Sequence, residues 1–173
     1  HLIGRQTMVQ EADAEPVTLS DLDGKTIAIG TPGSGIRFTA EQLLKAARLD
    51  TPGSIQTNDV GFREALDLLS QGKVDAAFYV GRLGANKRLR EAFASDPSLT
   101  LLSISPSLVN FLAIQNPGVY RTATIREGIY GVFPNIPNQT VSSLTTPTVL
   151  ITRPDTDSKS IRLITWSLIA TAR

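Results

Sequence analysis

The chain has 173 residues, 41% of them hydrophobic, which is enough for one domain with a packed core. Its 17 basic and 16 acidic side chains give a net charge of +1, so we expect no nucleic acid partner. Cysteine is absent, which excludes disulfides, zinc–thiolate sites and cysteine nucleophiles. Because the only histidine is the terminal His1, we also expect no metal site, no cofactor and no enzyme activity.

The termini and the hydropathy of the chain carry some information about its context. No stretch reaches the length of a membrane span, and none resembles a signal peptide. Since the chain begins with His1 instead of Met and ends within a helical pattern, we expect it to be a piece of a longer protein.

Strand-like and helical segments alternate along the first two thirds of the chain. Residues 1–9 are a candidate strand, and residues 20–25 look like a helical turn that closes on Gly24. The expected strands that follow are residues 26–30, 54–57, 74–80 and 99–104, and the expected helices are residues 37–48, 62–70, 83–94 and 106–115. This order predicts an α/β fold with a mostly parallel sheet flanked by helices.

The pattern changes after residue 115. Residues 119–131 are partly extended, and residues 133–138 carry two prolines and are not expected to be regular. Pro147 favours an edge or crossing strand over a central one for residues 141–152, and an amphipathic helix with Asp155 as its N-cap is expected at 160–172. We therefore divide the chain into an N-terminal or hinge segment (1–18), an α/β lobe (19–115), an extended return or hinge segment (116–153) and a C-terminal helix (154–173).

A turn rich in glycine, proline and serine joins the strand at 26–30 to the first long helix. The first amide groups of a helix have no internal partner, and the helix dipole places positive charge there, so this geometry can hold an anion. We predict that Gly33, Ser34, Gly35 and Ile36 bind a ligand at this turn. The turn lacks the lysine of a phosphate-binding P-loop and has the wrong spacing for a dinucleotide site, and a plain strand-to-helix connection remains the alternative.

Three further residues are candidates for the same site. Arg37 is either solvated or a partner for a ligand carboxylate. Asp59 is either the N-cap of the helix at 62–70 or a partner for a ligand amine, and Tyr79 either packs in the core or faces the ligand. Arg82 is expected to be solvated, and the basic cluster at 87–90 to be an exposed helix face.

These residues form a pattern that resembles the TAXI solute receptors, the substrate-binding components of TRAP transporters. The similar stretches are Leu19-x-x-Leu22-x-Gly24-Lys25-x-Ile27-Ala28-Ile29-Gly30-x-Pro32-Gly33-Ser34-Gly35, Thr39-Ala40-Glu41-Gln42-Leu43-Leu44, Ala65-x-x-Leu68-x-x-Gly72-Lys73-Val74-Asp75-Ala76-Ala77-Phe78, and Ile125-Arg126-Glu127-Gly128-Ile129-Tyr130 with 141–153. The resemblance implies a type II periplasmic-binding-protein fold of two lobes, of which this chain contains mainly the second. Ile36 departs from the family, where a hydroxyl residue is common.

The resemblance further implies extracytoplasmic or periplasmic binding of a small anionic solute, an acidic amino acid or an organic carboxylate. Its partners would be the membrane subunits of a TRAP transporter, and the full-length protein could carry a membrane anchor. The alternative is a ligand-sensing module of a signalling or regulatory protein. A homodimer of this fragment through its exposed cleft face is a further hypothesis.

Overall fold

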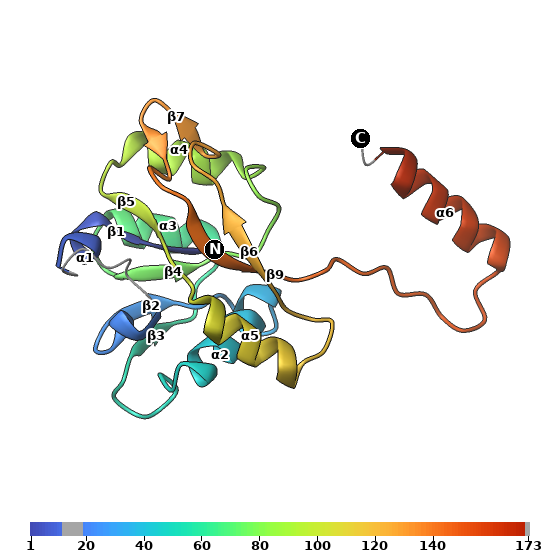
Figure 1. Ribbon diagram of the computed structural model, residues 1–173, viewed down its shortest axis with the longest axis horizontal. Helices are drawn as coiled ribbons and strands as arrows, with labels where there is room; N and C mark the ends of the chain where they lie inside the picture. Colours follow the sequence, from blue (N-terminus) through green and yellow to red (C-terminus); the bar gives the residue numbers. More distant parts are fainter. Residues whose placement is uncertain (12–18, 172–173) are drawn as a thin grey trace.

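A five-stranded sheet in the order β3-β2-β4-β1-β5 forms the centre of the computed structural model, which describes residues 1–11 and 19–171 (Figure 1). Strands β2, β3 and β4 run parallel, and β1 is antiparallel to both β4 and β5, so four strands point the same way. The strands are β1 (Leu2–Arg5), β2 (Thr26–Ala28), β3 (Gln56–Asn58), β4 (Ala76–Phe78) and β5 (Leu99–Leu102). The predicted α/β fold with a mostly parallel sheet is therefore confirmed.

The helices of the main body lie close to their expected positions. They are α1 (Gln6–Glu11), the 3₁₀ turn η1 (Leu19–Leu22), α2 (Gly35–Ala46), α3 (Phe62–Ser70), α4 (Lys87–Ser95) and α5 (Pro106–Gln115). The prediction of a helix from Leu83 was wrong, because the Asn86 side chain accepts a hydrogen bond from Leu89 N (3.1 Å) and caps α4 at that point. The candidate strand at residues 1–9 was too long, because β1 ends at Arg5 and α1 begins at Gln6.

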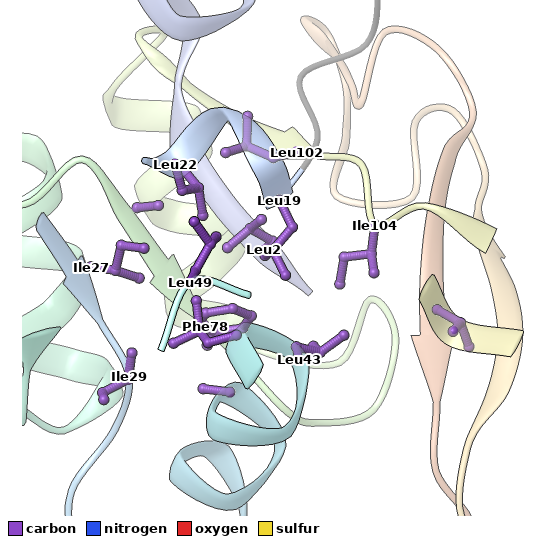
Figure 2. Close-up of a cluster of buried hydrophobic side chains, with 14 of the residues drawn as sticks. Leu2, Leu19, Leu22, Ile27, Ile29, Leu43, Leu49, Phe78, Leu102 and Ile104 are labelled. Atoms are coloured by element: carbon purple, nitrogen blue, oxygen red, sulfur yellow. The ribbon is translucent and has the colours of Figure 1, made fainter. Parts of the chain in front are cut away.

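Two hydrophobic clusters cover the two faces of the sheet. Neighbouring strand residues alternate between them, because successive side chains of a strand point to opposite faces. Leu2 packs with η1, α2 and α5 on one face, whereas Ile3 packs with α3 and α4 on the other. Figure 2 shows the first cluster, to which Leu22, Leu43 and Phe78 belong.

A second part of the chain, after α5, forms a ribbon beside the sheet. Strands β6 (Arg121–Ile125) and β9 (Val141–Thr145) pair with each other antiparallel, and β9 lies at an edge of this two-stranded sheet. The expectation of a strand through residue 152 was wrong, because β9 ends before Pro147, which has no N–H to donate. Between them, β7 (Gly131–Val132) and β8 (Asn135–Ile136) form a short hairpin. The expectation that 133–138 contains no regular structure was wrong for β8, because its residues lie between the two prolines and their backbone groups remain free to pair.

The C-terminal helix α6 (Ser158–Thr171) stands apart from the body on an extended segment (Figure 1). The predicted cap, Asp155, was wrong: Asp157 is the cap, because its carboxylate accepts from Ser160 N (2.9 Å). None of the residues of α6 is buried, although the helix is rich in apolar side chains such as Trp166. Within the described ranges, no helix is both long and apolar enough to cross a membrane.

Candidate functional site

The glycine turn between β2 and α2 adopts a conformation that glycine permits. Gly30 and Gly33 have φ values of +90° and +77°, a region that other residues rarely enter. Ser34 is the N-cap of α2, and its hydroxyl oxygen accepts a hydrogen bond from Arg37 N (3.1 Å). A hydroxyl that accepts in this way keeps its proton, so Ser34 can still donate to a ligand.

Two backbone donors at this helix start are unused. Within residues 1–11 and 19–171, the N–H groups of Gly35 and Ile36 have no acceptor, whereas Ser34 N donates to Thr31 O (3.1 Å). Gly33 and Gly35 are exposed, and Ser34 and Ile36 are half-buried, so a small molecule can reach the turn. The turn therefore offers adjacent amide donors at the positive end of a helix of 12 residues.

Arg37 and Asp59 are brought together, but they bind each other. The Arg37 guanidinium forms ion pairs with Glu41 in the next turn of α2 and with Asp59 after β3. The hydrogen bond to Glu41, followed by the charge of Asp59 and the hydrogen bond to it, raises the pKa of Arg37, which burial alone would lower. The predicted capping role of Asp59 was wrong, because α3 begins after Gly61, which makes no side-chain cap. A ligand carboxylate would compete with two carboxylates for Arg37.

A cavity of about 440 Å³ lies between α2, the segment after β4 and the β6–β9 ribbon. It lies beyond the carboxyl ends of β4 and β5, the side of the sheet on which ligands bind in open α/β folds. Of the predicted site residues, Tyr79 lines it and the six at or near the glycine turn do not. Its lining residues are His1, Thr39, Leu43, Phe78, Tyr79, Val80, Gly81, Arg82, Leu83, Ile104, Ala123, Thr124, Ile125, Ser143, Leu144, Thr145, Thr146 and Thr148.

Helix α2 connects the glycine turn to this cavity. Thr39 is one helical turn after Gly35, on the same side of α2, and its hydroxyl donates to Gly35 O (2.9 Å). Thr39 and Leu43 both line the cavity. The turn and the cavity are thus neighbouring parts of one surface.

One wall of the cavity is aromatic. The ring of Tyr79 packs against Phe62, with centroids 4.3 Å apart, and edge-on against His1 at 5.3 Å. His1 Nε2 forms a hydrogen bond with the hydroxyl of Tyr130, whose pKa is raised by burial. A Cβ atom at Gly81 would collide with the Tyr79 hydroxyl, so a glycine at this position leaves room for the Tyr79 side chain.

In the described part of the chain, the other walls carry hydroxyl groups and one arginine. Ser143 is only 4% exposed and has no hydrogen-bond partner for its side chain within the described part of the chain. Arg82 is exposed and forms no ion pair there. Ser143 is not among the predicted site residues, and Arg82 is expected from the sequence only as a solvated side chain. The Ser/Thr-rich run at 142–148 was a signal for the hydroxyls, but nothing local distinguishes Arg82 from a solvated arginine.

The fold and the position of the cavity define an α/β module, with a mostly parallel sheet flanked by helices, that has a cavity large enough for a small molecule. The sequence identifies the family: the chain belongs to the NMT1-like family, whose sequence model matches residues 5–170. No curated protein matches the chain.

Several solved structures are similar to this chain, at TM-scores too low to transfer a residue or a ligand. Domain 2 from TmArgBP is 23% identical, with 60% of this chain and 92% of that domain covered and a TM-score of 0.35. Holo ArgBP from T. maritima is 24% identical over 60% of this chain, which spans only 38% of that protein, with a TM-score of 0.34. The regulatory domain of Synechocystis PCC6803 CcmR, in complex with 2-PG, is 11% identical, covers 99% of this chain and 62% of its own, and has a TM-score of 0.47.

Proposed function

We propose that this chain is the lobe of a solute receptor that captures a small organic anion without chemical change. The observation that carries the proposal is the pair of unused amide groups, Gly35 N–H and Ile36 N–H, at the positive end of α2 beside the cavity. A carboxylate that accepts from both would gain charge-assisted hydrogen bonds and the favourable field of the helix end. The Ser34 hydroxyl would add a third donor.

The setting of this capture rests on the resemblance of the glycine-turn segment to the TAXI receptors. On that basis we place the protein outside the cytoplasm, delivering its solute to the membrane subunits of a TRAP transporter. Binding without catalysis fits the side chains available, because the turn offers backbone donors and no group that is placed as a general base. Membership of the NMT1-like family is compatible with this assignment.

One substitution removes a single proposed donor while keeping the helix. Gly35 is the first residue of α2, where proline is well tolerated, and Ser34 before it has φ −83° and ψ 153°, as residues before proline do. Gly35→Pro deletes one N–H that has no partner within residues 1–11 and 19–171. Gly35→Ala is the matched control, since it keeps the N–H and its Cβ meets nothing within 4 Å.

The assay is isothermal titration calorimetry of the full chain with a panel of dicarboxylates, acidic amino acids and inorganic anions. We expect Gly35→Pro to weaken binding of the anion by about 10- to 100-fold, the range for a hydrogen bond to a charged group. Gly35→Ala should bind like the unmodified chain. Equal affinities of the two variants, or no binding by any anion of the panel, would contradict the proposal.

A further inference from the structure

The electrostatic character of the cavity restricts the kind of ligand that fits it. Among the residues that the structure describes, its lining contains no aspartate and no glutamate, and Arg82 is the one permanently charged side chain. The carboxylates near the glycine turn, Glu41 and Asp59, are already paired with Arg37. A cationic group in the cavity would therefore meet a like charge, and no lining carboxylate would compensate it.

Arg82 differs from Arg37 in being available. The Arg37 guanidinium is engaged by two carboxylates, whereas Arg82 has no ion-pair partner within the described residues. Arg82 follows β4 at the carboxyl end of the sheet and lines the cavity together with Tyr79. A guanidinium at the mouth of a half-enclosed cavity is suited to a carboxylate, which it can bind through two parallel hydrogen bonds.

Ser143 supplies an independent sign that a polar ligand belongs there. Its residue is 4% exposed, it lines the cavity, and its hydroxyl has no partner within the part of the chain that the structure describes. The Ser143 hydroxyl is not itself buried without a partner, as the Tyr120 hydroxyl is among the described residues, so it is open to the cavity and free to donate a hydrogen bond there. A ligand oxygen in the cavity would accept a hydrogen bond from this hydroxyl.

We infer that the cavity binds the second acidic group of a dicarboxylate, with Arg82 as its charge partner and Ser143 as a hydrogen-bond donor. The inference rests on the proposed function, which places the first carboxylate at the start of α2. It narrows the ligand class: a dicarboxylate without an ammonium group is preferred over an acidic amino acid with the same carbon skeleton. Succinate and aspartate differ in this way and are the probes.

The experiment titrates the full chain with succinate and with aspartate by calorimetry. We expect succinate to bind at least about tenfold more tightly than aspartate, whose ammonium group has no lining carboxylate to pair with. Arg82→Gln should weaken succinate binding by about tenfold or more, and Ser143→Ala should weaken it by a smaller factor.

Two control variants match these changes. Arg88→Gln removes a positive charge from α4, away from the cavity lining. Ser142→Ala removes the hydroxyl of the residue before Ser143, and the Ser142 side chain points to the opposite face of β9. Both controls should bind succinate like the unmodified chain. Unchanged succinate affinity in Arg82→Gln, or aspartate binding as tight as that of succinate, overturns the inference.

The outcomes also separate this inference from the proposed function. If Gly35→Pro weakens succinate binding and Arg82→Gln does not, the function stands and the second subsite fails. If succinate does not bind the unmodified chain at millimolar concentrations, the inference fails, and the wider anion panel decides the function.

Discussion

Three glycines around the β2–α2 turn make a series that tests how the turn is built. Gly30 has φ +90°, and a Cβ placed there would lie 3.0 Å from both Arg37 N and Ile36 Cβ. Gly33 has φ +77° with nothing within 4 Å of its Cβ position. Gly35 combines an equally open Cβ position with a helical backbone. Alanine at Gly30 therefore adds both backbone strain and a collision. Alanine at Gly33 adds backbone strain alone, and alanine at Gly35 adds neither.

The expected stabilities follow from these differences. Gly33→Ala should cost about 1–2 kcal/mol in free energy of unfolding for the left-handed backbone. Gly30→Ala should cost about 2–4 kcal/mol, because the collision with the start of α2 adds overpacking to the same strain. Gly35→Ala should raise the free energy of unfolding by about 0.4–1 kcal/mol, since alanine restricts the unfolded chain.

Urea unfolding followed by far-UV circular dichroism measures the series. Tryptophan fluorescence is unsuitable, because the single tryptophan, Trp166, is 70% exposed on the separate helix α6. Equal stabilities of Gly30→Ala and Gly33→Ala would refute the collision, and a Gly33→Ala variant as stable as the unmodified chain would refute the backbone strain.

Three other predictions concern the body and the C-terminal helix. Phe93→Ala should lower the free energy of unfolding by about 3–5 kcal/mol because Phe93 is fully buried, whereas Phe111→Ala, at a position 49% exposed, should cost clearly less; equal losses in urea titrations would contradict this reasoning. Burial raises the pKa of Asp96, but hydrogen bonds from Ser98 Oγ (2.6 Å) and Ser98 N (3.0 Å) outweigh it and leave the pKa below its usual value. The stabilisation is therefore present above about pH 4 and lost as the pH falls through the lowered pKa, so the stability deficit of Asp96→Asn should shrink between pH 7 and about pH 3, and a constant deficit would argue against the ionised carboxylate. Removal of residues 158–173 should shift the melting temperature of the body by less than about 2 °C, because α6 has no buried residue, and a larger fall would reveal packing of α6 on the body.

The sequence by itself determined the features that depend on local physics. The alternation of strands and helices, α3 and α5 with their bounds, and the glycine turn before α2 all follow from hydrophobic periodicity, the position of Pro106 and the glycines. The donors of the turn were also predictable, because the first amides of any helix lack internal acceptors.

Only the tertiary structure decided which distant residues share the site. Strand β1 lies antiparallel between β4 and β5, a placement that no local signal indicates, and this brings His1 beside Tyr79 and Tyr130. The pairing of Arg37 with Asp59 spans 22 positions and depends on β3 lying next to β2. The cavity joins residues of α2, the end of β4 and β9, so the availability of Arg82 and the burial of Ser143 are properties of packing. Such long-range contacts follow from how the hydrophobic faces meet, and a reading of local periodicity does not contain that information.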